Sequence, residues 1–191
     1  ILSGQPVVLA PLLVTQQPNQ VWVSTSYRGG FHPDDCITFA RPDARMDLVC
    51  QWTTEHQGFV ETLVDRYDFS QGSDENVEAG WTHILEVGDT THGSCIMGVG
   101  PDGVSVGSIR AMRIDTATAD GKPRLVVTTR SGEAKKPPPA FTAKCKELIA
   151  EMDKDKPRPI DLMATIPAVE HVSTFVWNTN DFVPDTPGKP A

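Results

Sequence analysis

The sequence has no long apolar run and little positive charge, and both absences restrict its partners. Its longest apolar stretch, residues 6–14, falls well short of the roughly 18–20 residues that a helix needs to cross a bilayer. Lys and Arg number 17 against 25 Asp and Glu, which gives a formal net charge of -8. Nucleic acids and anionic membranes attract concentrated positive charge. We therefore expect neither a nucleic acid nor an anionic membrane as a partner, and no membrane insertion.

The motifs of common catalytic sites are missing as well. The chain contains no G-x-S-x-G, no H-E-x-x-H, no P-loop and no dinucleotide-binding glycine motif. A Ser/His/Asp triad leaves no such signature, because its members need only meet in space. The absences favour a protein that binds over one that catalyses, with a hydrolase as the alternative.

What the chain does contain is the composition of one folded domain. Its 191 residues are 39% hydrophobic and only 22% charged, whereas disordered chains combine low apolar content with high charge. The 16 prolines and 15 glycines suit many short elements joined by turns, because both residues interrupt helices. We expect a single domain over residues 1–183 and a disordered tail over residues 184–191, which lack packing residues.

A short apolar segment recurs five times at a nearly constant spacing. Aligned on one leucine, the copies are 36 to 40 residues apart, a period typical of propellers and solenoids. Each copy predicts a strand, because it is short and rich in Val, Leu, Ile and Thr. The five copies are residues 11–16, 47–52, 84–89, 124–129 and 161–166, and their leucines are Leu12, Leu48, Leu85, Leu125 and Leu162.

Alternating or aromatic segments between the copies predict further strands. They cover residues 21–27, 59–69, 94–99, 104–114 and 174–182. We therefore expect an all-β fold of about five repeats, most simply a small or irregular β-propeller. A β-sandwich is the alternative, in which the constant period is partly accidental.

One segment, residues 140–153, predicts a helix inserted between the fourth and fifth repeats. Its apolar residues follow helical spacing, at Phe141, Cys145, Leu148, Ile149 and Met152. Two prolines, Pro157 and Pro159, end the pattern.

The four cysteines predict two disulfides. Cys36 and Cys50 are equidistant from Asp43, so a hairpin with arms 36–40 and 46–50 places them directly opposite each other, within disulfide range. Two buried free thiols are the alternative for this pair. Cys95 and Cys145 form the second pair by elimination. An even count with a plausible partner favours a periplasmic or secreted protein.

Two turns share a form, the residues 43–49 and 120–126, which lie 77 residues apart. Here the chain resembles the FG-GAP or VCBS type of β-propeller repeat, in which a D-x-N-x-D-G-x-x-D turn precedes an apolar strand. That resemblance implies a calcium site in the turn, with acidic residues at its first, third, fifth and ninth positions. The chain departs from the pattern at Phe39 and Arg41 in one turn and at Arg124 in the other.

Calcium is the one cofactor that the sequence suggests. Asp153, Asp155 and Asp161 stand at positions one, three and nine before the fifth apolar segment, and calcium prefers such oxygen ligands. Because Lys154, Lys156 and Arg158 separate the carboxylates, a solvated helix end of mixed charge is the alternative.

Two loop regions carry the candidate ligand-binding residues. One combines aromatic and charged side chains suited to recognition of another protein, at Tyr27, Arg28, Phe31 and His32. The other consists of His56 and His92, which follow the second and third apolar segments in similar phase and could bind zinc or act as general bases. Exposed histidines without a ligand are the plainer interpretation.

These features favour a non-enzymatic periplasmic or secreted binding protein that recognises a protein or a glycan through its loops. Inhibitors, immunity proteins and adhesion modules are the expected classes. The alternatives are an extracytoplasmic hydrolase that uses loop histidines and carboxylates, and a structural subunit of an envelope complex.

Overall fold

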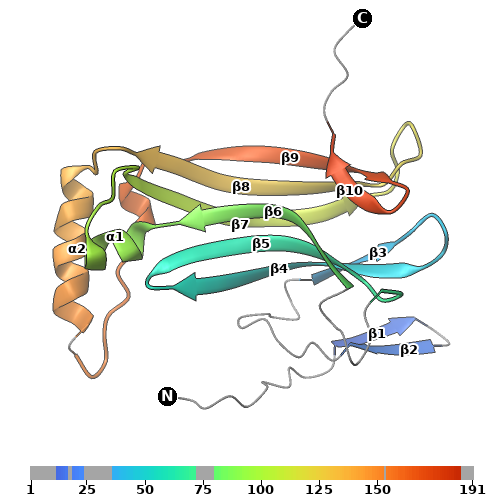
Figure 1. The fold of residues 1–191 in the computed structure, drawn as a ribbon, viewed down its shortest axis with the longest axis horizontal. Coiled ribbons are helices and arrows are strands. Elements are labelled where there is room, and N and C mark those ends of the chain that lie inside the picture. Colours follow the sequence, from blue (N-terminus) through green and yellow to red (C-terminus); the bar gives the residue numbers. More distant parts are fainter. Residues whose placement is uncertain (1–11, 17–18, 24–35, 72–79, 153, 186–191) are drawn as a thin grey trace, which may run out of the picture. The chain divides into compact units, whose positions relative to one another are not determined.

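The computed structural model describes residues 12–16, 19–23, 36–71, 80–152 and 154–185 (Figure 1). Strands dominate the described chain, which has two α-helices and one 3-10 helix. The strands are β1 Leu12–Gln16, β2 Asn19–Val23, β3 Cys36–Ala40, β4 Met46–His56, β5 Phe59–Asp68, β6 Trp81–Asp89, β7 Val104–Asp115, β8 Arg124–Ala134, β9 Val169–Asn178 and β10 Asp181–Pro184. The helices are α1 Thr91–Met97, α2 Pro139–Met152 and the 3-10 helix Met163–Thr165.

Contacts divide the chain into two compact units, residues 1–54 with 63–85 and residues 55–62 with 86–191. Strands β3-β4-β5-β6 form one four-stranded sheet, and β10-β9-β8-β7 form another. Strands β1 and β2 pair separately in antiparallel register. No helix of the described residues is long and apolar enough to cross a membrane.

The β3–β4 hairpin of the first unit has the arms that the cysteine symmetry predicts. Cys36 is paired with Cys50 and Ala40 with Met46 across antiparallel strands. The turn between them is closed by a hydrogen bond from Arg41 N to Arg45 O at 2.8 Å, with Ala44 at a φ of 65°. A disulfide joins Cys36 to Cys50, whose Cα atoms are 4.1 Å apart.

Residues of the first unit alternate between an apolar face and a charged face, as strand geometry requires. On one face, Leu48, Cys50, Trp52 and Tyr67 form a buried cluster. On the other face, buried Asp47 and Arg66 lie among valines such as Val64. The strands are thus buried on both faces, and the second face must accommodate ionised groups.

The core of the second unit lies where α2 packs on β7. Phe141 and Leu148 of α2 cluster with Val104 and Val106 of β7, together with Leu162 and Ile166. Strand β8 also buries Leu125 and Val127 fully, but these alternate with Ala134 of that core and so lie on the opposite face of the sheet from α2. The predicted helix, residues 140–153, agrees with α2 to within one residue at each end.

Two predicted strands are wrong. Residues 94–99 belong largely to α1 and the turn after it, because Asp89 Oδ1 accepts hydrogen bonds from Thr91 N and Thr91 Oγ1 and so starts a helix. Residues 161–166 form the 3-10 turn, in which Asp161 Oδ1 accepts a hydrogen bond from Ala164 N at 3.0 Å. In both places a carboxylate satisfies backbone donors that a strand would direct to a neighbour.

The five leucines of the apolar segments therefore share less structure than their spacing suggests. Four lie on strands, in β1, β4, β6 and β8, while Leu162 precedes the 3-10 helix. The described residues show two four-stranded sheets and neither a propeller nor a closed barrel. At the C-terminus, β10 reaches Pro184, and Arg124 Nε donates to Asp185 at 2.8 Å; residues 186–191 of the predicted tail lie outside the described residues.

Candidate functional site

Several of the predicted site residues fall outside the described residues. They are Tyr27, Arg28, Phe31 and His32 of the predicted recognition loop and Asp153 of the predicted calcium site. Of the other two carboxylates in that site, Asp155 is exposed and Asp161 holds the backbone of the 3-10 helix. Calcium binding there stays a prediction.

The two predicted histidine segments meet through their backbones. Gly93 N donates to Gly58 O at 2.8 Å, and an added Cβ on Gly58 would lie 2.9 Å from Gly93 N, so only glycine permits this approach. His56 and His92 themselves are exposed. No group of three or more His, Cys, Asp or Glu side chains suited to a metal occurs among the described residues.

In the two turns that resemble calcium-binding repeats, arginine holds the carboxylate. Arg45 donates to Asp43 through Nε and Nη2 at 2.9 and 2.7 Å. Arg124 binds Asp120 through both carboxylate oxygens, with Nη1 donating to Oδ1 at 2.7 Å and Nη2 to Oδ2 at 3.1 Å, and holds the pKa of that carboxyl well below its usual range. A guanidinium thus supplies the positive charge that a cation would bring.

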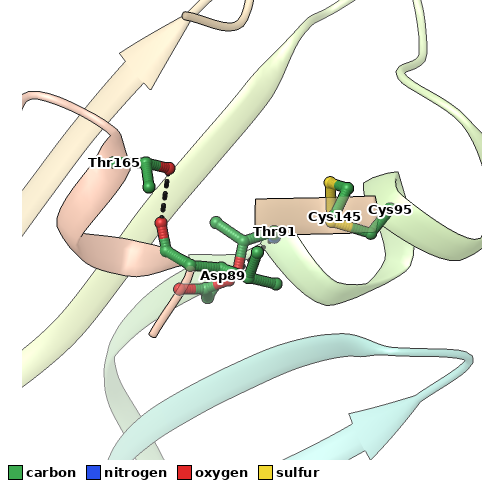
Figure 2. Close-up of a disulfide and its surroundings, with 6 residues drawn as sticks. Asp89, Thr91, Cys95, Cys145 and Thr165 are labelled. Atoms are coloured by element: carbon green, nitrogen blue, oxygen red, sulfur yellow. Dashed lines mark hydrogen bonds between the residues drawn. A yellow bond between two sulfur atoms is a disulfide. The ribbon is translucent and has the colours of Figure 1, made fainter. Parts of the chain in front are cut away.

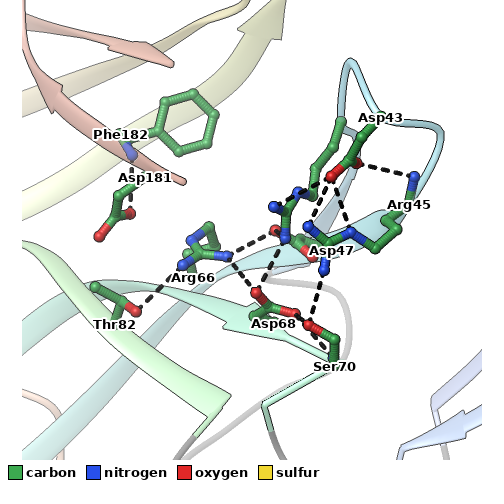
Figure 3. A network of polar contacts seen from close by, with 10 residues as sticks. Asp43, Arg45, Asp47, Arg66, Asp68, Ser70, Thr82, Asp181 and Phe182 are labelled. Carbon is green, nitrogen blue, oxygen red and sulfur yellow. Dashed lines mark hydrogen bonds and ion pairs between the residues drawn. The ribbon is translucent and has the colours of Figure 1, made fainter. Parts of the chain in front are cut away.

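A buried network of ion pairs occupies the charged face of the first unit (Figure 3). Arg66 Nη1 lies 2.7 Å from Asp47 Oδ2, and Arg41 Nη1 lies 3.0 Å from Asp68 Oδ2. All four side chains are at least nine-tenths buried. Two guanidiniums face two carboxylates, so their formal charges cancel. Arg41 Nη2 also lies 3.4 Å from Asp43 Oδ2. Because each of these charges is desolvated, removing one partner costs more than replacing a whole pair with apolar side chains.

The two carboxyls in this network have pKa values shifted in opposite directions. Burial raises the pKa of Asp47 in spite of the Arg66 hydrogen bond. Burial acts in the same sense on Asp68, but hydrogen bonds from Ser70 and the charges of Arg41 and Arg66 outweigh it and lower the pKa. The lowered pKa of Asp68 adds stability that is lost in acid, whereas the raised pKa of Asp47 acts in the opposite sense.

Replacing Ser70 with alanine is expected to raise the pKa of Asp68 and to move acid unfolding to higher pH. The Ser70 hydroxyl donates to Asp68 Oδ1 at 2.6 Å. A lowered pKa adds stability above the pKa of the unfolded chain, about 3.9, and this stability is lost as the pH falls toward the folded value. Urea unfolding measured from neutral to acid pH should show the variant's deficit shrinking in acid. A deficit of equal size at every pH would contradict this assignment.

The first unit also holds one histidine in the arrangement of a general base. His83 Nδ1 lies 2.9 Å from Asp65 Oδ1, and Trp52 Nε1 donates to the other oxygen of the same carboxylate. Asp65 is buried, whereas the His83 side chain is 49% exposed. Among the described residues, no Ser, Thr or Cys side chain is hydrogen-bonded to His83. The carboxylate orients the ring, but no nucleophile accompanies it, so the hydrolase alternative stays a prediction.

Within the part of the chain that the structure describes, the surface best suited to bind a ligand lies on α1 and α2 of the second unit. A disulfide between Cys95 and Cys145 joins α1 to α2 (Figure 2). Around it, five large apolar side chains are exposed to water, at 43–54% of their full area. We call them the helix-pair surface: Ile96, Met97, Val99, Ile149 and Met152.

Helix geometry explains why these residues form one surface. Ile149 follows Cys145 by one turn of α2, so both lie on the same side of the helix. Ile96 and Met97 directly follow Cys95 at the end of α1. Phe141 and Leu148 already fill the contact with the sheet. The apolar stripe of α2 is thus wider than the strip that its own sheet buries.

The sequence contained this surface but did not distinguish it. Ile149 and Met152 belong to the predicted apolar face of the helix, and the periodicity alone assigns them to the core with Phe141. Ile96 and Met97 lie in a segment predicted as a strand. The sequence feature that could have indicated this surface is the width of the apolar stripe on α2. The stripe has five positions in residues 141–152, and the sheet buries only two of them, Phe141 and Leu148.

Comparison of the chain with protein-family models, with curated proteins and with solved structures finds no match.

Proposed function

We propose that this chain is a non-enzymatic binding protein of an oxidising compartment, periplasmic or extracellular, that holds its partner at the helix-pair surface. The observation that carries the proposal is the group of five exposed apolar side chains around the Cys95–Cys145 disulfide. Contiguous apolar surface exposed to water marks interaction sites more often than chance, whereas single exposed apolar residues need no explanation.

Both disulfides support the compartment. Disulfides form and persist where thiols are oxidised, outside the cytoplasm, and all four cysteines of the chain are paired. The Cys95–Cys145 bond also fixes α1 against α2, which keeps the surface in one conformation. A preformed surface loses less conformational entropy on binding.

The chemistry of the surface indicates a partner with apolar groups of its own. The five side chains are aliphatic or methionine, and methionine adapts its shape to a binding partner. The surface has no aromatic ring on which a sugar could stack, and Trp52 and Trp177 are buried elsewhere. Of the two ligand classes that the sequence predicts, a glycan therefore fits this surface poorly.

Replacing Met97 and Ile149 together with serine is expected to abolish partner capture while the chain stays folded. The immobilised chain is exposed to the extracytoplasmic fraction of its source organism, membranes included, and saturable binding is measured. Because both side chains are half exposed, their loss should change the melting temperature little.

The matched control is Val172→Ser on β9 of the same unit, where the valine is 66% exposed but far along the chain from both helices. It should retain capture. Equal capture by the wild-type chain and the double variant would remove the proposal.

A further inference from the structure

The charge of the chain is distributed unevenly, and its basic part coincides with the helix-pair surface. Residues 135–158, which contain α2, hold seven Lys and Arg against four Asp and Glu. The rest of the chain holds ten basic residues against 21 acidic ones. The net charge of -8 therefore conceals a positive segment that directly joins the exposed apolar side chains.

Ion pairs hold two of the four acidic residues of this segment, Glu147 and Glu151, and leave lysines over. Glu147 accepts from Lys144 at 2.8 Å and lies 3.6 Å from Arg158. Glu151 pairs with Lys154 at 2.7 Å. Four exposed lysines form no ion pair with any described residue: Lys135, Lys136, Lys146 and Lys156.

Two of these lysines, Lys135 and Lys146, lie beside the apolar side chains. Lys146 directly follows Cys145 on α2 and precedes Ile149 by three residues, so the side chains of Lys146 and Ile149 are neighbours on the helix surface. The backbone of Lys135 lies against the turn after Val99, since an added Cβ on Gly103 would come within 2.6 Å of Lys135 Cα. Apolar and positively charged side chains thus lie together on α2, and a further lysine lies by the turn after α1.

The kind of basic residue indicates the kind of partner. Interfaces between proteins are enriched in arginine and depleted in lysine, whereas this segment has six lysines and one arginine. Clusters of four to eight basic residues at an amphipathic helix are typical of binding to anionic lipid headgroups; here Lys144 and Lys146 lie on α2, and the other five basic residues lie on the chain directly before and after it. A second copy of the chain docked face to face would set the lysines against one another, at an electrostatic cost.

We propose that the helix-pair surface docks on an anionic lipid surface. Met97, Ile149 and their apolar neighbours enter the boundary between headgroups and acyl chains, and the lysines remain level with the lipid phosphates, where long side chains can extend. The inference rests on the proposed function, because it names the partner of the same surface. It involves adsorption only, and no part of the chain spans the bilayer.

Neither half of the surface suffices without the other. A small apolar insertion binds membranes weakly and reversibly, and stable attachment needs a second contribution such as a basic patch. The acidic remainder of the chain is repelled by anionic lipid, so attachment depends on the lysines facing the membrane. Substitutions of the apolar side chains and of the lysines can therefore be tested separately.

The test is co-sedimentation of the full chain with phosphatidylcholine vesicles, either pure or containing about one third phosphatidylglycerol. We expect binding to the anionic vesicles, at least tenfold weaker binding to the pure ones, and loss of binding at high salt. Each lysine near an anionic surface contributes about fivefold, so Lys146→Gln with Lys156→Gln should weaken binding by about 25-fold. Lys122→Gln, an exposed lysine in the β7–β8 turn, is the matched control and should bind as the wild type does.

Three results would overturn the inference: no binding to anionic vesicles, equal binding to both vesicles, or full binding by Met97→Ser with Ile149→Ser. Failure of the wider proposal is distinguishable. If anionic vesicles do not bind but capture from the extracytoplasmic fraction still requires Met97 and Ile149, the partner is a protein and only the lipid inference fails. If neither assay depends on these residues, both fail.

Discussion

Replacing Arg66 with methionine is expected to lower the free energy of unfolding by about 3–5 kcal/mol. Arg66 Nη1 lies 2.7 Å from Asp47 Oδ2 and 3.5 Å from Asp68 Oδ2, in a site where its side chain is 6% exposed. Removing the guanidinium leaves Asp47 buried with Arg41 Nη1 3.6 Å away, too far for a hydrogen bond, and its other oxygen has no hydrogen-bond partner in the described chain. Methionine keeps most of the volume, so the loss reports charge and not a cavity. Urea unfolding followed by tryptophan fluorescence measures it.

The matched control is the double variant Arg66→Met with Asp47→Leu. A buried pair that is replaced as a whole by apolar residues often costs little, because the desolvation of both charges is removed with their attraction. The double variant should therefore recover most of the stability that the single variant loses. A double variant as unstable as the single one would show that the site depends on shape or on Arg41 and Asp68, and not on the Asp47–Arg66 pair.

Removing the Cys95–Cys145 disulfide by serine substitution at both positions is expected to cost about 4 kcal/mol. The two cysteines are 50 residues apart in sequence, and a crosslink that closes a longer loop removes more conformational entropy from the unfolded chain. The bond also holds α1 on α2. Urea unfolding, with helix content followed by circular dichroism, measures the loss.

Serine substitution at Cys36 and Cys50 gives the comparison. That bond closes a separation of only 14 residues, so the same reasoning gives about 3 kcal/mol. It also lies inside the β3–β4 hairpin, whose two strands are already joined by backbone hydrogen bonds. A larger loss from Cys36 and Cys50 than from Cys95 and Cys145 would contradict the loop-length explanation.

Local pattern was enough to predict much of the fold. The symmetry of Cys36 and Cys50 about Asp43 predicted the hairpin and its register, because opposite residues in a hairpin are fixed by the turn between them. The spacing of Phe141, Cys145 and Leu148 predicted α2, because helical contacts recur every three or four residues. The second disulfide followed by elimination.

Local pattern failed where a carboxylate just before a helix accepts a hydrogen bond from the backbone. Residues 94–99 have the composition of a strand, yet Asp89 and Thr91 start a helix just before them. The same happens at Asp161. Strand propensity reflects packing on a sheet and is easily overridden when no neighbouring strand is available.

For the candidate site, the sequence shows which residue types are present, but only the tertiary structure shows which of them come together. His56 and His92 were singled out by phase, yet the histidine that meets a buried carboxylate is His83, whose partner Asp65 lies 18 positions earlier. The basic residues of 135–158 are adjacent in the sequence, but the expectation about anionic partners was drawn from the net charge of the whole chain, -8, and overlooked them.

The sequence by itself determined the elements whose partners are near in the chain: the Cys36–Cys50 hairpin, the helix α2 and the predominance of strands. Only the tertiary structure decided which apolar residues remain exposed. Phe141 is buried and Ile149 is not, although both fit the same helical stripe, because burial depends on how much of a helix a distant strand covers. The pairing of Arg66 with Asp47 likewise depends on neighbouring strands. The surface around Cys95 and Cys145 is exposed because the sheet covers a narrower part of α2 than the full width of its apolar stripe.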